Sequence, residues 1–287
     1  MPQYIPPHVR DLGGFTVRRM LPQGARRSVG PFVFLDHIGP AEIAPGAGME
    51  VWPHPHIGLA TVTYLWEGAV MHRDSTGAVQ EINPGDVNWM TAGRGIVHSE
   101  RTPERLKGEA FRLHGLQTWL ALPKAHEEVE PAFVHHPRSA LPVVHDPDGA
   151  EIVVVAGHAF GARSPVAVFV DTLYAAVTLP AGCCLAVPPE HVERALYCVA
   201  GEVEIDGETP PEGHLAVLDP GTTALVRART DATFMLLGGA PVDAPRHMWW
   251  NFVHSDPARI ARAQDDWESG RFAAVPGETE FIPLPAR

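Results

Sequence analysis

Residues 52–68 read WPHPHIGLATVTYLWEG, a pair of histidines each preceded by proline and then a run rich in β-branched and aromatic residues. Alternate residues of a strand point to the same side, so His54 and His56 can face one point. Pro53 and Pro55 have a fixed φ and no N–H, which favours an extended backbone and reduces the entropy lost on ordering it. The stretch therefore predicts a strand that presents two imidazoles together.

Similar runs recur along the chain, separated by turn residues, since the sequence has 29 prolines and 27 glycines. Short runs of β-branched and aromatic residues between Gly and Pro are typical of strands. Many such strands with little helical periodicity predict an all-β sandwich or barrel. The runs are LATVTYLWEG (59–68), EIVVVAGHAF (151–160), SPVAVFVDTLYAAVTL (164–179), RALYCVAGEVEID (194–206) and ATFMLLGG (232–239).

One helical pattern stands near the C-terminus, SDPARIARAQDDWESG at residues 255–270. Ser255 or Asp256 can cap its N-terminus, Pro257 suits the first turn, and Gly270 suits the stop. An apolar stripe at spacings of three and four runs along one face. We therefore expect a short packing helix, with a stripe formed by Ile260, Ala263 and Trp267.

An internal repeat divides the chain. Residues 61–77 and residues 194–210 both contain a strand, a glycine, a second strand and a polar turn, and a Pro-Gly turn follows each. This similarity indicates two copies of one β-unit. We expect an N-terminal barrel over residues 1–130 and a C-terminal barrel with the helix and tail over residues 131–287. The seam falls in the polar stretch 127–142.

The formal charge is −12, from 34 acidic and 22 basic residues, which disfavours direct binding to nucleic acid or to anionic lipid. The sequence contains neither a long apolar run nor a signal-peptide pattern, so we expect a cytoplasmic protein without membrane contact. The three cysteines fit no disulfide framework and are expected to pack as small apolar residues. They are Cys183, Cys184 and Cys198.

A second pair of potential ligands, His98 and Glu100, repeats the spacing of His54 and His56 some forty residues later. If the two strands face each other, three imidazoles and one carboxylate converge. Such a set suits one divalent ion: iron(II), manganese, cobalt, nickel, copper or zinc. The alternative is a chance pair among 16 histidines, and the second His-x-Glu favours the metal. The other histidines are expected to have ordinary surface or hydrogen-bonding roles: His72, His135, His136, His145, His158 and His254.

HPHIGLATVTYLWEG resembles the first motif of the cupin superfamily, and PGDVNWMTAGRGIVHSE resembles the pirin version of the second motif. Ala60 stands where the general first motif has its glutamate. Pirins take their carboxylate ligand from the later His-x-Glu, so Glu100 supplies what position 60 lacks. The stretches 17–40, 115–123 and 270–285 are also similar to pirins, so the resemblance covers almost the whole chain.

The resemblance implies a bicupin, two antiparallel β-barrels of the jelly-roll type that lie face to face. It places the metal in the N-terminal barrel, held by His54, His56, His98 and Glu100. The C-terminal copy keeps His191 and Glu193, but Ala224 stands where the second motif would place its histidine. We therefore expect a C-terminal barrel without metal.

Pirins resemble quercetinases, which open a flavonol ring with dioxygen and release carbon monoxide. The implied ion is iron(II), and the implied partners are a flat aromatic substrate and dioxygen. Glu100 would take the proton of the substrate's 3-hydroxyl. Asp36 and Gln117 are candidates for orienting the histidines. Candidate pocket walls, each of which is also explained by core packing, are Trp52, Leu59, Trp89 and Met90.

Many pirins have Arg and Glu where this chain has Ile57 and Ala60, so the metal entrance is expected to be less polar. Two other functions remain open. The protein could act without catalysis, as a metal- and redox-responsive regulator that binds a protein partner, or it could hold a metal for stability alone. We expect a monomer.

Overall fold

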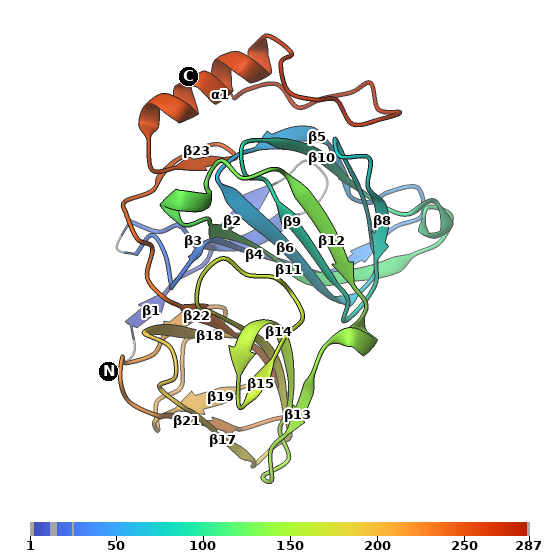
Figure 1. The fold of residues 1–287 in the computed structure, drawn as a ribbon. Coiled ribbons are helices and arrows are strands. Elements are labelled where there is room, and N and C mark those ends of the chain that lie inside the picture. The colour runs from blue at the N-terminus through green and yellow to red at the C-terminus, as the bar shows by residue number, and fades with distance from the viewer. Residues whose placement is uncertain (1–2, 12–15, 25, 286–287) are drawn as a thin grey trace. The chain divides into compact units, whose positions relative to one another are not determined.

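The computed structural model describes residues 3–11, 16–24 and 26–285, and antiparallel strands account for most of its regular structure (Figure 1). The chain forms two compact units. The N-terminal barrel unit consists mainly of Leu35–Arg138 and Val242–Arg287, and the C-terminal barrel unit consists mainly of Arg18–Phe34 and Ser139–Pro241.

The chain passes from one unit to the other after Arg138, inside the predicted seam. The units are not contiguous in sequence, however, and this differs from the predicted division at residue 130. The C-terminal helix and tail belong to the N-terminal barrel unit, because their apolar side chains pack on residues of that unit (Ile57 among them).

The N-terminal barrel unit contains two antiparallel sheets. The smaller sheet has the order β5-β10-β7-β8. Its strands are β5 (Glu50–His56), β10 (Ile96–Arg101), β7 (Val70–Asp74) and β8 (Val79–Ile82). The larger sheet contains the order β12-β9-β6-β11-β4. Its strands are β12 (Ala132–His136), β9 (Val87–Thr91), β6 (Leu59–Glu67), β11 (Phe111–Ala121) and β4 (Phe32–Ile43).

The C-terminal barrel unit has the same plan. Its larger sheet has the order β1-β20-β18-β22-β16-β14-β13, and its smaller sheet has the order β17-β21-β19. The larger sheet's strands are β1 (Gln3–Ile5), β20 (Leu215–Val217), β18 (Glu193–Ala200), β22 (Ala232–Gly239), β16 (Thr172–Leu179), β14 (Glu151–Ala159) with its partner β15 (Ala162–Arg163), and β13 (Val143–His145). The smaller sheet's are β17 (Cys184–Val187), β21 (Ala224–Ala228) and β19 (Val203–Ile205).

The strand orders confirm the repeat. In the larger sheets, β9-β6-β11 corresponds to β20-β18-β22, and in the smaller sheets β5-β10-β7 corresponds to β17-β21-β19. The predicted strands at 59–68, 151–160 and 232–239 form β6, β14 and β22. The run at 164–179 forms a strand only from Thr172 onward.

The predicted helix is α1 (Pro257–Glu268), and Asp256 is its cap, since the Asp256 carboxylate accepts a hydrogen bond from the Ala258 N–H. Ile260 and Ala263 are buried against Phe252, which confirms the expected stripe. In Figure 1, α1 and the tail that follows it lie over β5 and β10. No helix among the described residues is long and apolar enough to cross a membrane.

The remaining elements are short. They are β2 (His8–Asp11), β3 (Thr16–Leu21), the paired strands β23 (His247–Trp249) and β24 (Phe252–His254), and the 3₁₀ turns Glu104–Leu106, Lys124–His126 and Arg138–Ala140.

Candidate metal centre

Three imidazoles converge inside the N-terminal barrel unit. Strands β5 and β10 are antiparallel neighbours, and their register places His98 opposite His54 and Ile96 opposite His56. All three histidines are buried, and their ring centroids lie 4.4 to 5.0 Å apart. One potential ligand atom from each ring lies within 4.8 Å of the other two. The structure therefore brings together His54, His56 and His98 as predicted.

The hydrogen bonds of these rings fix which nitrogens are free. His54 Nδ1 donates to the Trp52 carbonyl at 2.8 Å, and His56 Nδ1 donates to the Asn251 carbonyl at 3.2 Å. A carbonyl can only accept, so Nδ1 of a neutral ring carries the proton and Nε2 keeps a lone pair. His56 Nε2 and His98 Nε2 face each other at 3.1 Å. Converging lone pairs of this kind fit a shared cation, and these three residues could hold it.

Burial keeps the rings in the form that binds metals. It lowers the pKa of His54 to about 4, against the opposing effect of the Trp52 carbonyl. Burial also holds the pKa values of His56 and His98 well below the ordinary value, with a further lowering from the neighbouring imidazoles. Neutral imidazoles bind a metal without first losing a proton.

Glu100 lies on the same strand as His98, is buried, and follows a register shift in the β5–β10 pairing. Its carboxylate accepts hydrogen bonds from Thr63 Oγ1 at 3.4 Å and from Gln117 Nε2 at 3.2 Å. Burial raises the pKa of Glu100, although His72 and these two donors act in the opposite direction. The ligand atoms that lie within 4.8 Å of one another come from the three histidines and not from Glu100. The role of Glu100 as a metal ligand therefore stays a prediction.

Two neighbouring side chains, Gln117 and His72, lie beside the candidate ligands. Gln117 was a candidate for orienting a histidine, but it hydrogen-bonds Glu100 instead. His72 has a hydrogen-bonding role, one of the two roles expected for it, and the structure adds where: its Nδ1 lies 3.4 Å from His98 Nδ1 and its Nε2 lies 2.9 Å from Asp74 Oδ2. The signal for His72 was present in the sequence, because His72 and Asp74 also have the i, i+2 spacing of a strand.

Other predicted neighbours divide by burial. Trp52 is 45% exposed, whereas Leu59, Trp89 and Met90 are buried, and their role as pocket walls stays a prediction. Ile57 is fully buried against Phe252 beneath α1, and the less polar metal entrance expected from Ile57 and Ala60 stays a prediction. Trp119 was not among the predicted neighbours, and its ring stands edge-on to His56 at 5.1 Å between centroids.

The C-terminal barrel unit differs at the corresponding strands. Ala224 lies opposite Val187, and both side chains are buried. Elsewhere in this unit a second group of potential ligands contains His158, Glu190 and His191. The absence of metal from this barrel therefore stays a prediction.

Asp171 organises the second group. Its carboxylate accepts hydrogen bonds from His158 Nε2 and His191 Nδ1, both at 2.9 Å. His191 Nε2 also lies 3.0 Å from the His158 carbonyl. Both ring nitrogens of His191 thus already have protein partners. His56 differs in that its Nε2 faces another imidazole, His98, and not a carbonyl.

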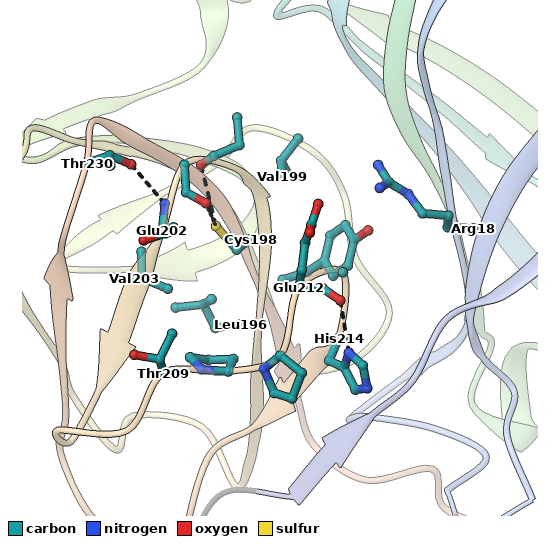
Figure 2. A pocket seen from close by; sticks show the side chains of 16 residues that line it. Arg18, Leu196, Cys198, Val199, Glu202, Val203, Thr209, Glu212, His214 and Thr230 are labelled. Carbon is teal, nitrogen blue, oxygen red and sulfur yellow. Dashed lines mark hydrogen bonds between the residues drawn. The ribbon is translucent and has the colours of Figure 1, made fainter.

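A cavity of about 600 Å³ also lies in the C-terminal barrel unit, with Arg18, Cys198, Glu212 and His214 among its lining residues (Figure 2). Cys198 Sγ donates to the carbonyls of Ala200 and Gly201, and burial raises its pKa to about 11. A thiol with such a pKa is a poor nucleophile at neutral pH. The three cysteines are free.

Comparisons with known proteins agree with this architecture. Residues 14–120 match the family model "Pirin", and residues 174–273 match "Pirin C-terminal cupin domain". A pirin-like protein of Caulobacter vibrioides is 48% identical over 96% of both chains. A putative quercetin 2,3-dioxygenase of Pseudomonas aeruginosa is 42% identical over 90% of this chain and 80% of its own.

A solved structure resembles the whole chain. The crystal structure of quercetin 2,3-dioxygenase from Acinetobacter baumannii superposes with a TM-score of 0.92 at 33% identity, over 100% of this chain and 95% of that one. The family models cover both barrels, and the strand orders repeat between them. The chain is therefore a bicupin that belongs to the pirin family.

Proposed function

We propose that this protein is a mononuclear metal-dependent dioxygenase of the quercetinase type, which opens the ring of a flavonol-like substrate with dioxygen. The observation that carries the proposal is the convergence of His54, His56 and His98, with buried Glu100 on the same strand. The relatives named quercetin 2,3-dioxygenase in Pseudomonas and Acinetobacter support it as similar proteins.

In the proposed site the three histidines hold one ion, with Glu100 as a fourth ligand or as a free base beside it. We propose iron(II), because dioxygen chemistry calls for a redox-active ion and nitrogen and oxygen donors suit it. When bound, the ion supplies a positive centre that stabilises a deprotonated substrate oxygen. The carbonyls of Trp52 and Asn251 keep Nε2 of His54 and His56 aimed at that centre.

Glu100 acts as the base for the substrate's 3-hydroxyl. Burial raises the pKa of its carboxyl, which makes the carboxylate a stronger proton acceptor. Gln117 and Thr63 bind its oxygens and limit its rotation. This arrangement supports a base that is held in one place before the substrate arrives.

The test is to purify the protein, quantify its bound metal, and measure oxygen uptake with quercetin in iron-loaded samples. We expect uptake that stops when a chelator removes the metal. If the iron-loaded protein consumes no oxygen while a control quercetinase is active, the flavonol reaction is excluded. That result would leave a metal-responsive regulator or a structural metal as the function.

Glu100→Gln separates the base from the fold. General-base catalysis is worth about 10²- to 10⁴-fold in rate, so we expect a loss of kcat of that order. Glu109→Gln is the matched control, because Glu109 is exposed and lies in the same unit. A Glu100→Gln variant that keeps both metal and full turnover contradicts the assignment of the base.

A further inference from the structure

His98 differs from the other two histidines in what binds its second nitrogen. His54 and His56 donate from Nδ1 to backbone carbonyls, whereas His98 Nδ1 faces Nδ1 of another side chain, His72, at 3.4 Å. His72 lies on β7, and β7 pairs with β10 along the edge opposite to β5. The orientation of His98 therefore depends on a neighbouring side chain.

Asp74 stands behind His72 and continues the chain of contacts. His72 Nε2 lies 2.9 Å from Asp74 Oδ2, and both side chains are buried. The other carboxylate oxygen, Oδ1, accepts from Thr76 N at 2.8 Å, Thr76 Oγ1 at 2.6 Å and Ala78 N at 3.2 Å. Three donors hold Oδ1, so Oδ2 is fixed as the acceptor for His72.

The ring of His72 is also held in its plane. Phe133, from β12, stacks on it at 4.2 Å between centroids with an interplanar angle of 15°. The hydrogen bond to Asp74 and this stacking leave His72 little freedom to rotate. Its Nδ1 stays directed at His98.

The chemistry of these atoms sets the protons along the chain. A carboxylate only accepts, so His72 Nε2 carries a proton. In a neutral His72 ring, Nδ1 is then an acceptor, and His98 Nδ1 donates to it. His98 Nε2 is left with its lone pair directed toward His54 and His56, whose rings lie beside it.

We propose that Asp74 and His72 form a relay that positions His98 and fixes its tautomer for metal binding. Both are positioning residues that act through His98 and do not touch the ion. The inference rests on the metal site of the proposed function, but it does not depend on the reaction. A carboxylate behind a ligating imidazole is a common way to orient it and to increase its basicity.

Asp74→Asn tests the relay with a change of one atom. Thr76 and Ala78 keep Oδ1 of the new side chain, so its NH₂ group faces His72 Nε2 and donates where the carboxylate accepted. The tautomers of His72 and His98 then reverse, and a proton falls on His98 Nε2. Loss of such outer partners weakens metal binding by about 10- to 100-fold.

The measurement is the affinity of the metal-free full-length protein for Zn²⁺, in competition with a chromophoric chelator. Histidine ¹⁵N NMR of the zinc-loaded protein reports the tautomer of His98. We expect the affinity for Zn²⁺ to fall in both Asp74→Asn and His72→Phe. In the wild type we expect the proton of His98 on Nδ1. Asp86→Asn is the matched control, because Asp86 Oδ2 lies 3.8 Å from His135 Nε2 in a turn of the same unit.

The outcomes separate the relay from the reaction. If both relay variants bind Zn²⁺ within about threefold of the wild type, a difference typical of a neutral surface change, the relay is wrong. A wild type that binds no Zn²⁺ overturns the metal site and the relay together. A third outcome is that the variants lose affinity for Zn²⁺ as expected but the iron-loaded wild type shows no oxygen uptake with quercetin. That result supports the relay and excludes the flavonol reaction.

Discussion

The two barrels join corresponding strands in different ways. In the N-terminal barrel unit, β5 and β10 carry imidazoles whose nitrogens converge, and His54 lies opposite His98. In the C-terminal barrel unit, the corresponding β17 and β21 pair Val187 with Ala224, and no imidazole comes from either strand. A buried guanidinium instead links the residues next to these strand ends.

That guanidinium belongs to Arg194, which is only 1% exposed. Its Nη1 donates to the carbonyls of Val187 and Pro188, at 3.1 and 2.9 Å. Its Nη2 donates to the carbonyls of Asp219 and Thr222, both at 2.7 Å. One side chain thus ties the end of β17 to the turn before β21.

The difference shows that the same pair of strands can carry a structural cross-link in one barrel and a cluster of potential ligands in the other. Both terminal nitrogens of Arg194 find their acceptors within the protein, and only its buried Nε has no hydrogen-bond partner among the described residues. The three histidines instead bring one nitrogen each within 4.8 Å of the others, and they could hold a cation between them. Five predictions test this comparison.

The largest effect is expected for Arg194→Met. The change removes four hydrogen bonds between a buried guanidinium and backbone carbonyls, and we expect a loss of about 3–5 kcal/mol in the free energy of unfolding. Denaturant unfolding of the full chain measures it, and zinc affinity should stay that of the wild type. A loss below about 1 kcal/mol would mean that the guanidinium does not link these strands.

Metal should stabilise only the N-terminal barrel unit. A ligand at 100 times its Kd adds about 2.7 kcal/mol to the stability of the state that binds it. We expect hydrogen exchange to slow in β5 and β10 when Zn²⁺ is added and to stay unchanged in β17 and β21. The His54→Ala variant is the control, and equal protection of both pairs of strands would contradict the comparison.

The outer faces of the two strand pairs should also differ. Ser99 Oγ donates to Glu278 of the C-terminal tail, as do Nε and Nη2 of Arg101, whereas Leu225 of β21 is 46% exposed. Burial alone would raise the pKa of Glu278, but the hydrogen bonds from Arg101 and Ser99 lower it. We expect Glu278→Gln to cost about 1–3 kcal/mol, the worth of a charged hydrogen bond.

The pH dependence of this tail contact follows from the sign of the shift. A depressed carboxyl pKa adds stability above the unfolded value of 4.5, and the contribution is lost as the pH falls through the folded value. We expect proteolysis of the tail to accelerate as the pH falls below about 4.5, the ordinary range of glutamate. An acid-stable protease reports it, and a rate that ignores pH in the wild type would contradict the contact.

The smallest effect is expected for His191→Ala. Asp171 and the His158 carbonyl already bind both ring nitrogens of His191, so we expect one metal per chain in both the variant and the wild type. Metal analysis after removal of loosely bound ions measures it. Two ions in the wild type and one in the variant would place a second metal in the C-terminal barrel unit.

Local patterns in the sequence were enough for most of the strands, for the repeat and for two of the three clustered histidines. His54 and His56 share a strand, so their common direction follows from two-residue periodicity alone. The pairing of His98 with that strand came from the matching spacing and from the resemblance to pirins. The local sequence also predicted where α1 begins, although only the structure identified Asp256, and not Ser255, as the N-cap.

The rest depended on contacts between residues far apart in the chain. Gln117 meets Glu100, Ile57 lies beneath α1, and Arg194 reaches carbonyls on both sides of its own position. None of these contacts has a local period, because sheet order and side-chain direction in the folded barrel create them. The sequence by itself therefore determined the elements and the donor atoms, and the tertiary structure decided what surrounds and orients them.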